Sequence, residues 1–510
     1  MRFATLAAAG VAALVLASTA SAGPYTLSST ATASGPSLFS TCTTDSRGAQ
    51  EAGGSILYPN SEPEMRADVN PTNSANIVGA YQQDRWSDGG ARGLVASWTK
   101  NGGATWHPVV IPDVTACSGN AGYVRASDPW VSFAPNGDLY AISLSFNQPG
   151  VPSPANAIFV NKSTNGGESW GAPIAVAQDD TNGLDKQSIT ADPFDSNYVY
   201  AAWDRFVSPP GFPPSDLGRF HAAAFVQQAF FSRTTNGGAS WEPPQVLYNP
   251  GTQAGTIGSI INVLPDRTLV DGFVVFANHK RTIRGAYVAD VRSTDLGASW
   301  SKKATLIAPV DASFPGPTDP DHPNLIIRGG ELPDFAVDRV SGKLYAVWDD
   351  DLPDGVDKIY FSQSSDGGLT WSDPVKINKT PTNVPTLDQQ AFTATVKVAA
   401  DGTVGVTYYD FRNNTSAPGL NTDYWFVHCH GSCTDLANWA ETHVAGPFDE
   451  EQAPYARGYF VGDYEGMVTT GNVFGPFYGQ AVTRDGESAP PFDYKPVFNP
   501  SDAFYSTLTP

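Results

Sequence analysis

The chain has 510 residues, of which 41% are hydrophobic and 16% are charged, and its formal net charge is −21 at pH 7. An acidic surface of this kind repels phosphate backbones, which excludes nucleic acid as the expected partner. Beyond the N-terminus, no segment is apolar over enough residues to predict a membrane span.

The first residues predict a secretory signal peptide over 1–22. Arg2 supplies the positive start, residues 4–17 form an apolar run too short to span a bilayer, and the small residues 20–22 suit cleavage. We therefore expect a secreted, extracellular protein whose mature chain starts near Gly23.

An even number of cysteines in an exported chain predicts disulfide bonds. The four are Cys42, Cys117, Cys429 and Cys433. We pair the last two in a tight loop, which leaves the first two for each other. The string "HCHGSC" also places His428 and His430 beside two thiols, so a zinc site is the alternative there. Export favours the disulfide, and we predict no metal at these residues.

Strand pairs follow one another along the rest of the chain. Each has an apolar strand, a turn rich in Pro, Asn, Asp or Gly, and a second strand rich in Val, Tyr and Trp, which is typical of antiparallel hairpins. In chain order they lie at 65–85, 127–146, 186–205, 332–350 and 392–412. The exception is 220–231, which fits either a short helix or a surface loop.

An eight-residue sequence ending in tryptophan occurs five times among these hairpins, and we call the five copies the octet turns. They read "TKNGGATW", "STNGGESW", "TTNGGASW", "STDLGASW" and "SSDGGLTW", at 99–106, 163–170, 234–241, 293–300 and 364–371. A decayed copy ends at Trp439, and a last unit at 464–482 leads to a remnant near Asp485.

These repeats predict an all-β chain of seven units with about four strands each. Radially repeated four-stranded antiparallel sheets form a β-propeller, so we expect seven blades, with six as the alternative. We assign 61–510 to a single propeller domain and 23–60 to an N-terminal extension.

The octet resembles the Asp-box, or BNR repeat, of the sialidase superfamily, which has the pattern Ser/Thr-x-Asp/Asn-x-Gly-x-Thr/Ser-Trp. The resemblance covers nearly all of the mature chain and implies a secreted, bacterial-type sialidase-like propeller. It also places the boxes between the third and fourth strands, on the face away from the active site. The third-position side chain can accept backbone hydrogen bonds, and the fifth-position glycine tolerates positive φ. We therefore interpret five residues as structural: Asn101, Asn165, Asn236, Asp295 and Asp366.

Charged residues gather at the opposite face. If the octet turns mark one face, the ends of second strands and the starts of first strands build the other. The residues at these positions are Asp84, Arg85, Asp128, Asp185, Lys186, Asp204, Arg205, His279, Arg281, Asp349, Asp388, Asp410, Arg412, Asp463, Tyr464 and Glu465. Such a ring is either a ligand site or a set of salt bridges that tie the blades together.

The resemblance implies roles for some of them. Asp128 would be the acid/base and Tyr464 the nucleophile of a sialidase-type glycoside hydrolase acting on a terminal, possibly acidic, sugar. The arginines of three blades, Arg85, Arg205 and Arg412, would bind the sugar carboxylate, since a guanidinium bonds a carboxylate bidentately. We predict that Asp84, Asp204 and Lys186 also contact substrate.

The sequence departs from the superfamily in two places. The early Phe/Tyr-Arg-Ile-Pro motif is absent, with Arg66 in "EMRADV" as the nearest arginine, and Glu465 would point away from Tyr464. Two alternatives therefore stay open. One is a polysaccharide lyase or a glycosidase that uses Asp128, Asp410 or Asp463 as a carboxylate pair. The other is a non-catalytic propeller that binds glycan or protein.

No cofactor is required by either mechanism, and calcium is a candidate ligand. Hard oxygen ligands gather at Asp349, Asp350 and Asp351 with Asp354 and Asp357, and again at 318–324. Neither has EF-hand spacing, and solvated acidic loops are the alternative. We expect a monomer that binds a carbohydrate.

Overall fold

A computed structural model describes residues 23–43, 55–147, 155–207, 226–277, 284–312, 316–329, 332–456, 458–482 and 501–510. The predicted signal peptide, the remnant near Asp485, His279 and Arg281 lie outside these residues. The described helices are short 3-10 turns at Ala116–Ser118, Leu387–Gln389, Leu436–Asn438 and Glu450–Gln452. Within this part of the chain, no helix has the length and apolar character needed to cross a membrane.

The described strands pair antiparallel in seven groups of four, as the alternation of apolar strands and polar turns predicts. Group 1 is β3 (Arg66–Val69), β4 (Ile77–Trp86), β5 (Ala91–Thr99) and β6 (His107–Val110). Group 2 is β7 (Arg125–Phe133), β8 (Leu139–Phe146), β9 (Asn156–Ser163) and β10 (Ile174–Asp179). Group 3 is β11 (Gly183–Ala191), β12 (Val199–Val207), β13 (Val226–Thr234) and β14 (Gln245–Tyr248).

The remaining groups repeat this plan. Group 4 is β15 (Ala254–Val263), β16 (Leu269–Ala277), β17 (Gly285–Ser293) and β18 (Thr305–Val310). Group 5 is β20 (Asp334–Val337), β21 (Leu344–Asp350), β22 (Lys358–Ser364) and β23 (Val375–Lys376). Group 6 is β24 (Ala391–Val398), β25 (Val404–Asp410), β26 (Asn421–Cys429) and β27 (Trp439–Asp449). Group 7 is β29 (Gly466–Thr470), β30 (Val473–Ala481), β31 (Ser501–Thr509) and β1 (Thr26–Thr32). The short strand β2 (Leu57–Tyr58) pairs with the end of β4, and β19 (Ile327–Arg328) pairs in parallel with β28 (Tyr459–Phe460) as a separate two-stranded sheet.

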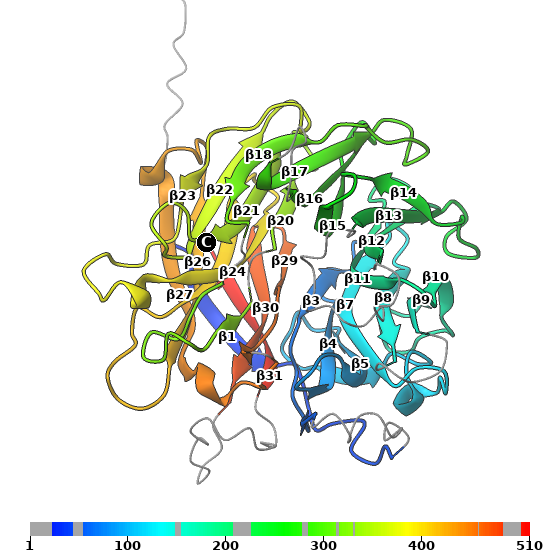
Figure 1. The fold of residues 1–510 in the computed structure, drawn as a ribbon, viewed down its shortest axis with the longest axis horizontal. Coiled ribbons are helices and arrows are strands. Elements are labelled where there is room, and N and C mark those ends of the chain that lie inside the picture. The colour runs from blue at the N-terminus through cyan, green and yellow to red at the C-terminus, as the bar shows by residue number, and fades with distance from the viewer. Residues whose placement is uncertain are drawn as a thin grey trace, which may run out of the picture.

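The first strands of the seven groups lie next to one another. Each contacts the first strand of the following group, and β29 of group 7 contacts β3 of group 1. Figure 1 shows these strands around the middle of the molecule. Apolar side chains fill the space between groups; Ile142 of β8, for example, shares a buried cluster with Ile189 and Trp203 of group 3.

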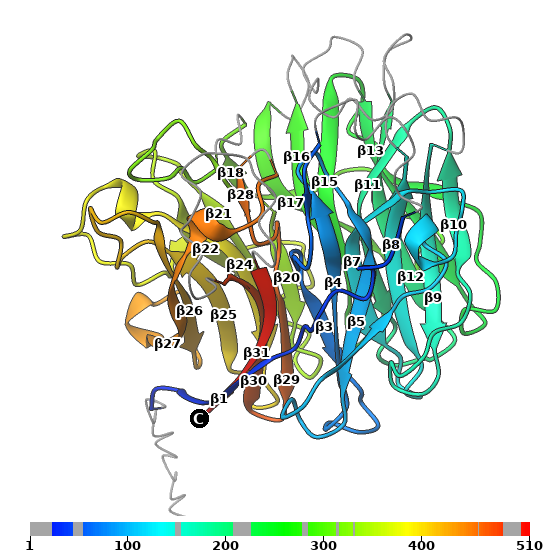
Figure 2. The same ribbon diagram turned by 90° about the horizontal axis from the view of Figure 1, so that it is seen from below.

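The N-terminal strand completes group 7. β1 pairs antiparallel with β31 near the C-terminus, and Figure 2 shows the two side by side. Sequence analysis assigned 23–60 to an extension outside the propeller domain, whereas the structure uses part of it as a fourth strand. A second expectation also changes, because residues 226–231 of the possible helix belong to β13.

Both disulfides form as paired from the sequence. Cys42 joins Cys117, and Cys429 joins Cys433. The second bond consumes both thiols of "HCHGSC", so no thiolate is left there for zinc.

The octet turns lie between the third and fourth strands of groups 1 to 5, as the resemblance implies. In the second copy, the Asn165 side-chain oxygen accepts hydrogen bonds from the Ser163 hydroxyl at 2.9 Å and the Ser169 amide at 3.1 Å. The Gly167 amide donates to Ser163 at 3.0 Å, with φ of 92° at Gly167. All five copies share the contact between first and third positions. Each polar group therefore has a structural task.

Candidate active site

A repeated backbone irregularity builds the candidate site. In β7, β11, β15 and β24 the strand register shifts near the start of the strand, as in a β-bulge. The residues at these shifts have positive φ: Asp128 at 52°, Lys186 at 48°, Gly258 at 79° and Thr393 at 55°. Non-glycine residues rarely adopt this conformation, and strain of this kind often occurs at functional sites.

Glu64 fits the same pattern before β3, two residues ahead of Arg66, with φ of 59°. The bulges of neighbouring first strands therefore bring Glu64, Asp128 and Lys186 to one place. The Lys186 amine lies 2.9 Å from Asp128 Oδ1, 3.5 Å from Glu64 Oε1 and 2.5 Å from Asp463 Oδ2. We call Glu64, Asp128, Asp185, Lys186, Asp463 and Tyr464 the central cluster.

Hydrogen bonds from β4 hold Glu64. Its Oε2 accepts from the Gln82 amide group and, at 3.3 Å, from the Asp128 backbone amide. Arg85 donates to Gln82 Oε1 at 2.6 Å and lies 3.9 Å from Glu64. Because Glu64 is only 1% exposed, these donors replace the water it loses.

Tyr464 lies against the same carboxylates. Its ring contacts Trp130, and the Arg66 guanidinium lies 3.6 Å from the Trp130 ring centroid and 4.8 Å from that of Tyr464. Asp334 pairs with Arg66 at 3.2 Å. The Tyr464 hydroxyl is buried and has no hydrogen-bond partner among the described residues. A buried hydroxyl without a partner is uncommon and calls for a functional explanation.

Burial and like charge shift the proton affinities of the central cluster. Burial first, and then Asp128, raises the pKa of Glu64 to about 7, although Lys186 and Arg85 oppose this. The same two causes raise the pKa of Asp185 to about 7. Burial disfavours charge on Lys186, but the carboxylates of Asp128, Asp463 and Glu64 raise its pKa well above the usual value. Burial, Glu64 and Asp128 also raise the pKa of Tyr464. The cluster therefore holds exchangeable protons near neutral pH beside a fixed positive charge.

Two residues predicted to contact substrate, Asp84 and Asp204, instead hold other parts of the protein. Asp84 accepts from the Asn60 amide at 2.7 Å and pairs with Arg92 at 3.4 Å. Asp204 accepts from Thr256 at 2.7 Å and from the Gly258 amide at 3.0 Å, so it holds the bulge of β15. Both carboxylates are fully buried, which fits a structural role better than substrate contact.

The three predicted arginines do not share one ligand site. Arg205 pairs with Asp179 of β10 at 2.7 Å. Arg412 pairs with Asp410 and with Glu441 of β27, each at 2.6 Å, and stacks on Trp425. Of the three, Arg85 alone contacts the central cluster among the described residues. The expected convergence of three arginines on a sugar carboxylate is therefore corrected, because Asp179 and Glu441 occupy two of the guanidinium groups.

Asp410 is also separate from the central cluster. Its carboxylate accepts from Thr380 at 2.6 Å and from the Trp425 indole at 2.9 Å, in addition to Arg412. Burial raises the pKa of Asp410 to about 6, with Arg412 opposing. The structure thus unites the predicted catalytic residues Asp128, Asp463 and Tyr464 but leaves Asp410 in a network of group 6.

Sequence reasoning missed Glu64. Glu465, the neighbour of Tyr464 in sequence, points between groups 6 and 7, where the Tyr409 hydroxyl of β25 and the Gly479 amide of β30 each donate to it at 3.0 Å. Glu64 takes the place beside Tyr464. Alignment of the repeats could have found it, because Glu64 precedes Arg66 by two residues, as Asp128 precedes Trp130.

No protein-family model matches the chain, and a search of the curated proteins finds no match. Among solved structures, a Hadza microbial sialidase is 16% identical with a TM-score of 0.45, over 69% of this chain and 64% of its own. Phage phi92 endosialidase is 10% identical with a TM-score of 0.47, over 89% and 68%. Penicillium chrysogenum alpha-L-arabinanase is 13% identical with a TM-score of 0.44, over 69% and 92%.

The match thus spans less than two thirds of the first of these sialidases.

Proposed function

We propose that the chain is a secreted, monomeric, sialidase-like glycoside hydrolase whose active site is the central cluster. The observation that carries the proposal is the buried Tyr464 hydroxyl, which lies beside Glu64 and Asp128 and has no hydrogen-bond partner within the described part of the chain. The seven groups of strands are then seven blades of one closed propeller domain, with β1 closing the last blade. The contacts from β29 back to β3 support closure.

In this proposal Tyr464 is the nucleophile and Glu64 is its base. A free tyrosine is a weak nucleophile, so its proton must leave as the bond to the anomeric carbon forms. Glu64 has a pKa of about 7, which suits a general base at neutral pH. The proton of the hydroxyl passes to Glu64, and the glycosyl group is transferred to the tyrosine oxygen.

Asp128 and Asp185 supply the acid. Burial and then Asp128 raise the pKa of Asp185 to about 7, so Asp185 holds a proton near neutral pH. That proton goes to the glycosidic oxygen as its bond to the sugar breaks. In the second step the pair takes a proton from water, which attacks the anomeric carbon and releases the tyrosine oxygen. Lys186 keeps a positive charge beside both steps, and Asp463 holds the amine in place.

The charge of the central cluster favours a neutral terminal sugar. Arg205 and Arg412 are paired with carboxylates elsewhere, and Arg85 is 6% exposed. Lys186 and Asp185 remain partly open, whereas Asp463 is buried, and the central cluster as a whole carries more acid than base. An acidic sugar would meet this field without the arginine clamp that a carboxylate needs.

A screen of the purified protein against fluorogenic glycosides, with neutral terminal sugars and a sialoside in parallel, tests the proposal. We expect hydrolysis of a neutral glycoside. A 2-deoxy-2-fluoro analogue of the cleaved sugar should then label Tyr464, as read by peptide mass. A label on Asp128 or Asp463 would instead establish a carboxylate nucleophile. The absence of hydrolysis with every reporter would contradict the proposed glycoside hydrolase activity.

A glycan-binding propeller is the second candidate. The full pairing of Asp84, Asp204, Arg205 and Arg412 within the protein favours it, because these residues then only hold the sheets together. Saturable binding of a neutral glycan without turnover, lost in Lys186→Ala, would establish this function.

A further inference from the structure

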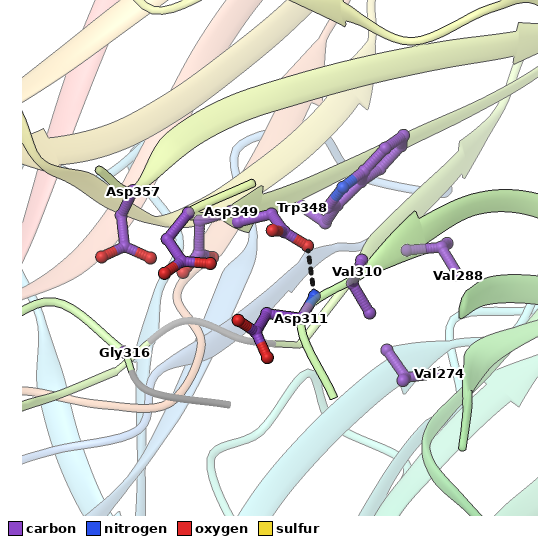
Figure 3. A pocket seen from close by; sticks show the side chains of 10 residues that line it. Val274, Val288, Val310, Asp311, Gly316, Trp348, Asp349 and Asp357 are labelled. Atoms are coloured by element: carbon purple, nitrogen blue, oxygen red, sulfur yellow. Dashed lines mark hydrogen bonds between the residues drawn. The ribbon is translucent and has the colours of Figure 1, made fainter. Parts of the chain in front are cut away.

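A small pocket lies between groups 4 and 5, apart from the residues of the central cluster. Val274, Val288, Val310 and Trp348 form its apolar wall. The opposite wall is acidic and consists of Asp311, Asp349, Asp350, Asp351 and Asp357. Figure 3 shows the carboxylates of Asp311, Asp349 and Asp357 turned toward the same space. We call these five the acidic wall.

The pocket is partly open, and the space in it that a water-sized particle can occupy is about 20 Å³. Asp311 follows β18 of group 4, while Asp349 and Asp350 end β21 of group 5. Asp357 stands at the other end of the loop that leaves β21. A particle in the pocket would therefore contact two neighbouring groups of strands.

Among the described residues, two of the carboxylates have no donor from another residue. Asp357 is 5% exposed, and the donor found at its carboxylate in that part of the chain is its own backbone amide. Asp351 Oδ1 is enclosed and has no partner among the described residues. Asp350 differs, because its oxygens accept from the Leu352 amide at 2.7 Å and the Asp311 amide at 3.1 Å.

No lysine or arginine lines the described wall of this pocket. Asp349 and Asp357 are 4% and 5% exposed. Lys358, which does not line the pocket, offsets part of the charge near Asp351. Grouped carboxylates that have lost solvent repel one another, and a bound cation reverses this balance because it is the largest local charge.

We propose that the acidic wall binds one calcium ion. Ca²⁺ takes six to eight oxygen ligands, mostly carboxylates and carbonyls, in flexible geometry, which suits several aspartates from two loops. Mg²⁺ demands near-ideal octahedral geometry and is usually held by one or two carboxylates with several retained waters, which suits a cluster of five aspartates less well. The ion ties the loop after β21 to Asp311 of the neighbouring group and so has a structural role, independent of the proposed enzyme.

Isothermal calorimetry and thermal unfolding of the full, chelator-stripped protein test the site. We expect one Ca²⁺ per chain, and at a hundred times the dissociation constant a rise in Tm of roughly 3 to 5 °C. Mg²⁺ should bind at least tenfold more weakly. The absence of heat and of a Tm rise at millimolar Ca²⁺ would overturn the proposal.

Asp357→Asn locates the ion. This variant should lose the calcium-dependent rise in Tm, while its Tm in chelator stays equal to or above that of the parent, because a repelling carboxylate is gone. That second readout separates a lost site from a damaged fold. The matched control is Asp354→Asn, in the same loop but outside the pocket, which should keep calcium binding within about twofold.

A second group of ligand atoms offers a competing location. Asp319, His322 and Glu451 place one ligand atom each within 4.8 Å of one another. If Glu451→Gln abolishes the calcium response and Asp357→Asn keeps it, the ion binds there and the acidic wall is not the site. Terbium luminescence excited through tryptophan gives an independent check, because Trp348 lines the pocket: emission should fall in Trp348→Phe.

Discussion

The two ends of the sheets differ in the kind of residue that has a positive φ. At the octet turns glycine mostly adopts it, as at Gly167 with φ of 92°, although Leu296 of the fourth copy does so at 58°. Hydrogen bonds hold the first- and third-position side chains there, as in the second copy. At the other end Glu64, Asp128 and Lys186 adopt it, although each carries a side chain that disfavours it. The repeats thus place mostly glycine corners at one end and strained, charged residues at the other, where the candidate site lies.

The carboxyl groups at the two ends also differ in pKa. Slight burial acts against ionisation of Asp366 in the fifth octet turn, but hydrogen bonds from Thr370 lower its pKa to about 2. Glu64 has a pKa raised to about 7, first by burial and then by Asp128. The octet turns keep their acids charged and satisfied, whereas the central cluster holds acids that can gain and lose protons.

The largest expected effect is the loss of turnover in Tyr464→Phe. If the hydroxyl is the nucleophile, hydrolysis of the best glycoside should fall at least about a thousandfold, or roughly 4 kcal/mol in the barrier. The hydroxyl has no partner to lose, so Tm should change by no more than about 1 °C. Initial rates and thermal unfolding measure the two.

The control for this variant comes from the other end of the sheets. Asp366→Asn removes the charge that accepts from Ser364 and Thr370 in an octet turn. It should lower Tm and leave the rate per folded molecule unchanged. A folded Asp366→Asn protein without activity would show that the octet turns take part in catalysis and would contradict their structural role.

The next effect is on stability. Trp371 packs among Phe335 and residues of group 4, and its indole donates to buried Asp290 at 2.7 Å. Trp371→Ala should lower the free energy of unfolding by about 3 kcal/mol, through lost contacts and an unpaired carboxylate. Denaturant unfolding measures it. Trp371→Phe, which keeps the ring but not the donor, should recover part of the loss; equal losses in both would assign the whole effect to the hydrogen bond.

A smaller effect is expected from pH at the acidic wall. The folded pKa of Asp357, about 8, exceeds that of the unfolded chain, so its contribution to stability is complete below about pH 4 and is lost as pH rises toward 8. In chelator, unfolding free energy should therefore fall over this range, with a part on the order of 2 kcal/mol absent in Asp357→Asn. Calcium should reverse the trend. A parent protein as stable at pH 8 as at pH 5 in chelator would contradict this.

Much of the architecture was predictable from local sequence. Alternating apolar residues and turn residues define hairpins within a few positions, so the four-strand units and the place of the octet turns follow from the repeats. The pairing of β1 with β31 was not predictable in this way, because it joins residues 26–32 to 501–509 across the whole chain. A short strand without a hairpin partner has no local signal.

The candidate site was predictable only in part. Asp128, Lys186, Asp463 and Tyr464 were found because strand ends could be counted, and the structure unites them. Glu64 lies before its strand and was missed. The predicted convergence of the arginines failed for another reason. Arg205 and Arg412 pair with Asp179 and Glu441, which belong to outer strands. The repeats do not specify in which direction the side chains of those strands point.

The smallest effect is expected from Arg205→Lys, which tests whether Arg205 contacts substrate. Arg205 is partly exposed and pairs with Asp179 away from the central cluster. Arg205→Lys keeps the charge but not the guanidinium fork, which would be costly if Arg205 clamped a substrate carboxylate. We expect the rate and KM for the best neutral glycoside to change by less than about twofold, and Tm by about 1 °C or less, because an exposed ion pair contributes little. Kinetics of Arg205→Lys beside the parent protein measure this. A tenfold rise in KM for an acidic sugar, with no change for a neutral one, would restore the arginine clamp and place an anionic substrate at the face where the second strands end.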